Sequence, residues 1–213
     1  MRPTSTDRLP GPLALAVAAG WFALAVGLAR SGFFRTWAGL GPLSAVQVAI
    51  VAPPTAFGVA YAALPSLRAW TRALDPTFLT AVQVLRILGS AHLVYWGAGI
   101  MAGVFALCVG TGNLLVAGLA LYTVPRVARR DPGWRTRLLA VTILGIAEFL
   151  MTIGLAVAGL FAAPTPWDPP VSPAGLMPFT RLPLSVFPTY LIPLFLTIHV
   201  ATLLRLRGAS ADD

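Results

Sequence analysis

The sequence predicts an all-α integral membrane protein: one six-helix transmembrane bundle with both termini in the cytoplasm and kinks in its second and sixth spans. Of its 213 residues, 57% are hydrophobic and 10% are charged, which leaves too few charges to cover a soluble domain. Several apolar stretches reach the roughly 18 residues that cross a hydrocarbon core of about 30 Å. The arginines also concentrate in alternate loops, which indicates a fixed orientation in the membrane.

Six apolar segments are expected to span the bilayer. They cover residues 12–29, 43–64, 77–106, 112–127, 138–161 and 188–206. We expect one membrane domain over residues 12–207, with short cytoplasmic tails at 1–11 and 208–213. The first segment follows Arg2 and Arg8 and looks like a secretory signal. Cleavage within "AVAAG" would fall inside the apolar run, so an uncleaved first span is predicted.

The third span carries a clear helix start. Asp75 can cap the helix, and Pro76 suits the first helical position because its missing N–H would have no partner there. A helix that continues to residue 106 would be about 45 Å long at 1.5 Å per residue, so it would have to tilt or project from the bilayer. The segment "LCVGT" is then predicted to form the tight turn before the fourth span.

Prolines predict bends in the second and sixth spans. Pro53 and Pro54 lie near the middle of the second span, where a kink is expected. Pro193 lies inside the sixth span and leaves the carbonyl of Thr189 without its helical donor. This bend either packs against neighbouring helices or opens a cavity, and the sequence leaves both interpretations open.

The basic residues predict the orientation. All fifteen are arginines, and the net charge is +8. An inside N-terminus puts most of them in cytoplasmic segments, so both termini should face the cytoplasm from the plasma (inner) membrane. The cytoplasmic set is Arg2, Arg8, Arg68, Arg72, Arg126, Arg129, Arg130, Arg135, Arg137, Arg205 and Arg207, and the outer set is Arg30, Arg35 and Arg181.

The same charges exclude some partners. The arginines form no basic stripe interleaved with aromatic residues, so we expect contact with the lipid bilayer rather than with nucleic acid. Cys108 is the only cysteine, which rules out an intrachain disulfide or a cysteine metal cluster. A homo-oligomer or a partner in a membrane complex is compatible with this composition.

Glu148 is the most informative polar residue within the spans. It is the only glutamate and lies about 15 Å into its segment at 1.5 Å per residue. Thr142, Gly145 and Thr152 share its helix face. A carboxyl group at this depth is either protonated or paired with a cation. It serves either as a structural contact or as a ligand, ion or proton site.

Arg86 and His199 are predicted to lie beside Glu148. Arg86 either extends its side chain to the headgroups or turns inward to form a salt bridge with Glu148. His199 should lie at a similar depth, as a packing residue or as a ligand. His92 lies about 120° around the helix from Arg86 and is interpreted as a packing residue. With His199 it is also a candidate for haem or metal binding.

Asn113, in "VGTGNLL", has two interpretations. It either caps the fourth span after the tight outer turn or helps to bind an anion at a helix N-terminus.

Four segments resemble a group of small, largely uncharacterised bacterial six-span integral membrane proteins. They are "QVLRILGSAHLVYWGAG", "VGTGNLLVAGLALY", "ILGIAEFLMTIGL" and "PLSVFPTYLIPLFLTIHVATL". Arg86, Glu148 and His199 match the charged positions of that group. Asn113 stands where the group has an acid, so this chain lacks the group's charge at that position. The resemblance implies the six-span fold and no established activity.

Three functional hypotheses follow. The first is a small-molecule or proton-coupled transporter or binder that uses the buried Arg/Glu/His cluster. The second is a structural subunit of a membrane complex, and the third is a haem or metal protein that uses His92 and His199. The chain offers no Ser–His or paired-acid motif, which argues against an enzyme. The sequence points to no particular cofactor.

Overall fold

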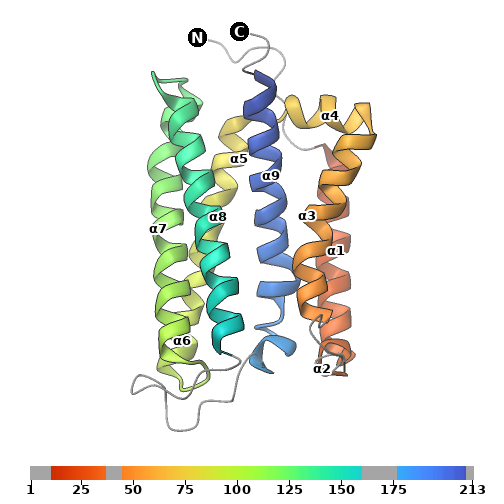
Figure 1. Cartoon of the computed structure of the whole chain (residues 1–213), viewed down its shortest axis with the longest axis vertical. Helices are drawn as coiled ribbons and strands as arrows, with labels where there is room; N and C mark the ends of the chain where they lie inside the picture. Colours follow the sequence, from red (N-terminus) through yellow and green to blue (C-terminus); the bar gives the residue numbers. More distant parts are fainter. Residues whose placement is uncertain (1–10, 37–44, 160–176, 210–213) are drawn as a thin grey trace.

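Within the described part of the chain, six helices long and apolar enough to cross a membrane lie side by side in the computed structural model (Figure 1). The structure describes residues 11–36, 45–159 and 177–209, and no strand occurs within these ranges. The all-α prediction with six apolar spans is therefore confirmed. The spans are Pro12–Arg30, Ala45–Ala63, Pro76–Gly97, Gly103–Ala128, Trp134–Ala156 and Phe187–Gly208.

Short elements connect and complete these spans. Three consecutive elements form the third span, and a π-helical turn precedes the last helix. The elements are α1 (Pro12–Arg30), α2 (Phe33–Thr36), α3 (Ala45–Ala63), α4 (Pro65–Arg72), α5 (Pro76–Val82), η1 (Gln83–Ser90), α6 (Ala91–Gly97), α7 (Gly103–Ala128), α8 (Trp134–Gly159), η2 (Met177–Thr180), η3 (Phe187–Leu191) and α9 (Ile192–Ala209).

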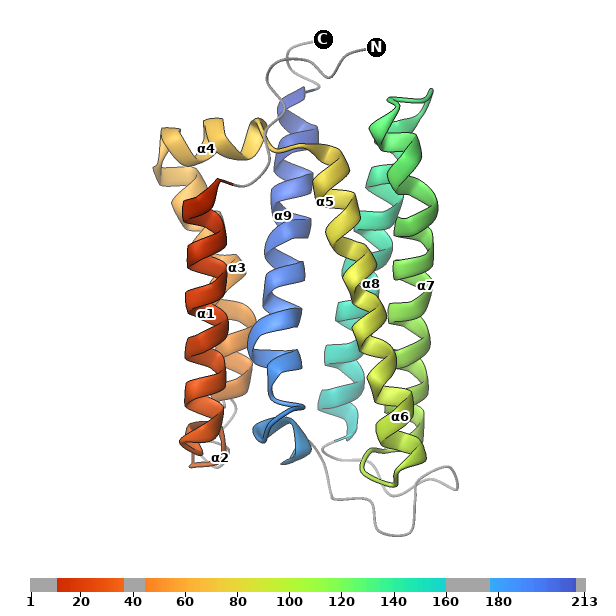
Figure 2. The same cartoon turned by 180° about the vertical axis from the view of Figure 1, so that it is seen from behind.

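Helix α9 occupies the centre of the bundle. Helices α1 and α3 lie on one side of it, and α5 to α8 lie on the other (Figures 1 and 2). Helix α9 contacts α3, α4, α5 and α8, whereas α1 lies at the edge. The start of α1 and the end of α9 lie at the same end of the bundle, and α4 lies across that end (Figure 2).

One end of the bundle is strongly basic. The ends of α4, α7 and α9 and the start of α8 lie at this end (Figure 1), and most of the arginines belong to these segments. We call this the basic end. Its described arginines are Arg68, Arg72, Arg126, Arg129, Arg130, Arg135, Arg137, Arg205 and Arg207, whereas the opposite end has Arg30, Arg35 and Arg181.

The bundle is apolar outside and polar inside. Leu13, Val94 and Leu150 expose 77%, 71% and 65% of their surface. Many polar side chains are instead buried between the helices, and several threonines donate to the carbonyl one turn earlier, as Thr142 does to Leu138 at 2.9 Å. This distribution suits lipid, where polar groups must be satisfied within the protein.

The third span begins as predicted and ends earlier. The Asp75 carboxylate accepts a hydrogen bond from the Thr77 amide at 2.8 Å, and a proline follows at the first helical position. The helix stops at Gly97. Gly99 has a φ of 73° and donates to Trp96 at 2.9 Å, while Ile100 donates to Tyr95 at 2.9 Å. These two bonds form a Schellman motif, for which glycine is preferred.

This early end corrects two predictions. The expected third span of residues 77–106 is too long, and "LCVGT" lies within helix α7 rather than in a turn. The real turn, residues 98–102, is Ala-Gly-Ile-Met-Ala and has no polar residue to mark it. Asn113 therefore lies in the interior of α7 and caps no helix.

The helix geometry near the prolines differs between the second and the sixth span. Helix α3 continues as one α-helix through Pro53 and Pro54. In the sixth span, the π-helical turn lies immediately before Pro193. The Thr189 hydroxyl there donates to the Ser185 carbonyl at 2.7 Å. Single π turns within helices are frequent at functional sites. The bends themselves stay predictions.

Candidate functional site

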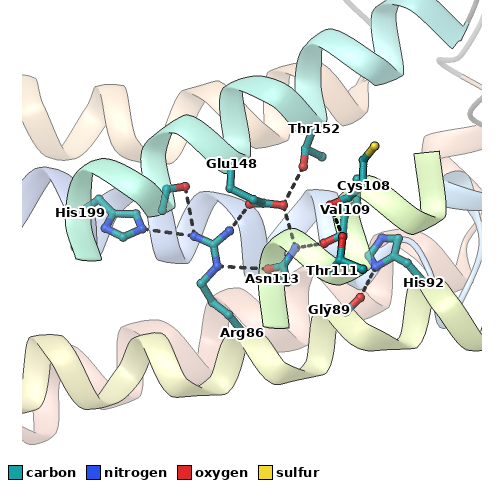
Figure 3. Close-up of polar contacts among 11 residues, drawn as sticks. Arg86, Gly89, His92, Cys108, Val109, Thr111, Asn113, Glu148, Thr152 and His199 are labelled. Carbon is teal, nitrogen blue, oxygen red and sulfur yellow. Dashed lines mark hydrogen bonds and ion pairs between the residues drawn. The ribbon is translucent and has the colours of Figure 1, made fainter. Parts of the chain in front are cut away.

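A buried ion pair joins Arg86 and Glu148, which come from two different spans (Figure 3). Arg86 comes from η1, at the midpoint of the third span, and Glu148 comes from α8. Their residue exposures are 1% and 5%. Nη2 of Arg86 donates to Oε2 of Glu148. Arg86 thus turns inward to Glu148 and does not extend toward either end of its span.

Arg86 uses its remaining nitrogens on three other groups. Nε donates to Oδ1 of Asn113 at 3.1 Å, and Nη1 donates to the Gly145 carbonyl at 3.1 Å. Nη1 also lies 3.4 Å from Nε2 of His199. A guanidinium can only donate, so we assign Nε2 as the acceptor. This assignment makes the imidazole neutral, with its proton on Nδ1.

Glu148 accepts hydrogen bonds from two further side chains. Its Oε1 accepts from Nδ2 of Asn113 at 2.8 Å and from Oγ1 of Thr152 at 2.9 Å. Asn113 therefore turns its oxygen to the cation and its nitrogen to the anion, and bridges the pair from α7. With one positive charge, one negative charge and neutral partners, the network has no net charge. That balance lowers the cost of burying it.

Aromatic rings cover the guanidinium. The Cζ atom of Arg86 lies 3.9 Å from the ring centroid of Phe149 and 5.9 Å from that of Phe195. These two rings stack at 6.3 Å, and the edge of His199 meets Phe149 at 6.1 Å. A cation over a desolvated ring is stabilised by about 2 kcal/mol. No sequence pattern indicates this contact, apart from the position of Phe149 next to Glu148.

Glycines make room for the polar side chains. A Cβ atom on Gly89 would lie 2.9 Å from Nδ2 of Asn113, and one on Gly112 would lie 2.8 Å from Cγ of Glu148. A Cβ atom on Gly145 would lie 2.9 Å from Nη1 of Arg86 and would overlap His199. Each of these glycines thus lies opposite a polar side chain of another helix, and the small residue lets the helices approach closely.

His92 lies apart from the ion pair. Its Nδ1 is 2.7 Å from the Gly89 carbonyl, and its ring packs among Phe105, Phe179 and Phe187 at centroid distances of 6.1, 5.9 and 4.7 Å. Figure 3 shows His92 and His199 at opposite ends of the polar network, so they do not converge on one haem or metal. Within the described residues, no group of three or more metal-ligating side chains occurs.

Two residues near the pair keep buried polar atoms without hydrogen-bond partners. The atoms are Nδ1 of His199 and both the nitrogen and the oxygen of the Gln83 side-chain amide. Gln83 precedes Arg86 by one turn of a 3₁₀ helix, in which residues three apart are eclipsed. It therefore lies on the side of Arg86 that faces the basic end. Buried polar groups of this kind call for a functional or solvent partner.

A small cavity borders the network on its other side. Its volume is about 20 Å³, and Arg86, His92, Asn113, Thr152 and Phe195 contribute to its lining. One water molecule needs roughly 10–15 Å³ of such volume, so the cavity is large enough for about one.

The comparisons with known proteins identify a family. Residues 43–207 match a family model described as "Domain of unknown function (DUF8737)". The match covers more than half of the chain. The chain belongs to the DUF8737 family. The DUF8737 region contains the whole polar network, whereas α1 and α2 lie outside it. No curated protein and no solved structure matches the chain.

Proposed function

We propose that this chain is a proton-coupled transporter or binder in which Glu148 takes up and releases a proton. One observation carries the proposal: a titratable carboxylate lies at mid-span and is held by an arginine from another span. Ionisable groups at that depth are costly and mark ion and proton pathways. A proton on Glu148 neutralises the carboxylate and ends the charge pairing between η1 and α8.

The size of the neighbouring cavity favours a proton over a larger cargo. Small-molecule sites occupy about 300–1,000 Å³, whereas the cavity beside Arg86 has a volume of about 20 Å³. A proton needs no such space. A small-molecule substrate would require the helices to separate, and the loss of the ion pair on protonation is a step that would allow it.

The unpartnered atoms support a direction for proton entry. His199 carries its proton on the unpartnered Nδ1, and Gln83 offers both a donor and an acceptor. Gln83 lies toward the basic end, whose excess of arginine supports a cytoplasmic orientation in a plasma (inner) membrane. Protons would therefore reach Glu148 from the cytoplasmic side, past Gln83 and His199.

A structural role is the second candidate, and a specific observation favours it. Every nitrogen of the Arg86 guanidinium and both oxygens of Glu148 have partners within the protein. Because all of these atoms are paired, the network also serves as a fixed link among four helices. In that case the chain is a subunit of a homo-oligomer or of a larger membrane complex.

Infrared difference spectroscopy between acid and alkaline buffers distinguishes the two candidates without a known substrate. Proton uptake predicts a carboxylic-acid C=O band that appears on acidification while the protein stays folded. The band should be absent in Glu148→Gln and present in Asp75→Asn, which removes a carboxylate at the end of a span. If no band depends on Glu148 over the whole pH range in which the helices persist, the network is structural.

A further inference from the structure

A groove between α8 and α9 opens at the basic end. Its volume is about 500 Å³. The polar and apolar parts of the lining are separate: Arg135 and Thr136 of α8 and Arg207 of α9 lie nearest the basic end, and apolar side chains follow toward the middle of the bundle. We infer that this groove binds one anionic phospholipid of the leaflet at the basic end. The apolar part includes Leu139, Ile143 and Leu203.

The upper part of the groove suits a phosphate headgroup. Arg135 and Arg207 are both exposed, and none of the described residues that line the groove is acidic. Arg135 and Thr136 lie in the first turn of α8, where the helix dipole adds positive potential. The Cζ atom of Arg135 lies 5.6 Å from the ring centroid of Trp134, and tryptophan is enriched at the headgroup level.

The lower part suits an acyl chain. Arg135, Leu139 and Ile143 follow one another at intervals of four residues, so they share one face of α8. Ile143 lies about 12 Å below Arg135 along the helix axis at 1.5 Å per residue. Leu203 of α9 lines the opposite wall. A free phosphate would use only the arginines, whereas a phospholipid fills both parts. Basic pockets between spans bind acidic lipid headgroups in this way.

A lipid in this groove would contact both helices that flank the ion pair. Helix α8 provides Glu148 and the Gly145 carbonyl, and α9 provides His199. The bound lipid would therefore hold together two helices whose spacing fixes the polar network. This role does not depend on whether Glu148 binds a proton.

Native mass spectrometry of the detergent-solubilised full chain tests the inference. Bound lipid is counted with dioleoyl phosphatidylglycerol and with dioleoyl phosphatidylcholine as the neutral reference. Each arginine near an anionic headgroup contributes about 1 kcal/mol. At 1.4 kcal/mol per tenfold change, the double variant Arg135→Gln/Arg207→Gln should bind phosphatidylglycerol about 30-fold more weakly.

Two further variants make the test specific. Arg126→Gln/Arg129→Gln removes the same charge at the same end but away from the groove, and should keep binding within about twofold, less than half of one such arginine's contribution. Ile143→Trp keeps both charges and fills the apolar part, and should abolish lipid binding. Equal loss in both double variants, full binding in Ile143→Trp, or equally tight binding of glycerol phosphate alone would each overturn the inference. Helical circular dichroism checks that every variant is folded.

Discussion

Replacing Glu148 with glutamine should destabilise the protein by about 3–5 kcal/mol, the cost of removing one partner from a buried ion pair. The amide oxygen of the new side chain can still accept from Asn113 and Thr152. Its NH₂ group, however, is a donor that would face Nη2 of Arg86, which is also a donor. Arg86 is only 1% exposed, so Nη2 would be left without an acceptor from this side chain. A lone arginine at the centre of a span costs about 2.5–3.5 kcal/mol on insertion scales, which agrees with the lower part of this range.

The double variant Arg86→Gln/Glu148→Gln separates the pair from its surroundings. Two amides can bond to each other, so the double variant should recover about 2–3 kcal/mol relative to the sum of the single variants, the upper part of the range for groups in contact. The free energy of unfolding is measured by titrating sodium dodecyl sulfate into mild detergent micelles and following helical circular dichroism. The matched control pairs Glu148→Gln with Arg126→Gln.

Arg126 lies about 20 Å along α7 from Asn113, at 1.5 Å per residue, so the control cycle should be additive. Additivity within about 0.3–0.5 kcal/mol in the Arg86–Glu148 cycle as well would refute the reasoning. It would mean that the two charges are stabilised by their own surroundings rather than by each other.

Two further predictions concern the helix contacts and the orientation. Gly145→Ala should destabilise the protein by about 1–3 kcal/mol, the cost of overpacking. A Cβ atom on Gly154 in the same helix would meet nothing within 4 Å, so Gly154→Ala should be neutral or stabilising by up to about 1 kcal/mol. Equal unfolding free energies for the two variants would contradict the close approach at Gly145. In a Cys108→Ala background, Ser31→Cys should react with an impermeant thiol reagent in intact cells and Ser66→Cys only after lysis. The reverse labelling would invert the orientation.

The ion pair could be predicted from the sequence because the apolar segments contain few carboxylates. Glu148 is the only glutamate, and no aspartate lies within an apolar segment, so an inward-facing Arg86 had one carboxylate available. The start of the third span was equally readable, since Asp75 and Pro76 each have a local reason to be there.

The end of that span could not be read in the same way. The segment "WGAGIMAG" contains three glycines, and each could terminate a helix. Only Gly99 adopts the left-handed conformation that does so. Because the turn was predicted at "LCVGT", Asn113 was expected at the start of the fourth span and not in the interior of α7. Its position between the two charges was therefore not predicted. The rings over Arg86 depend on how α8 meets α9, which no local pattern specifies.

The bridging position of Asn113 has a consequence for the order in which the chain is made. Arg86 precedes Glu148 by 62 residues. A ribosome that adds about 5–20 residues per second needs about 3–12 s to synthesise that interval. During this time the cation of the third span has no carboxylate within the membrane. Asn113 follows Arg86 by only 27 residues, so its carbonyl oxygen reaches the membrane first and gives the guanidinium an acceptor while the fifth span is still being translated.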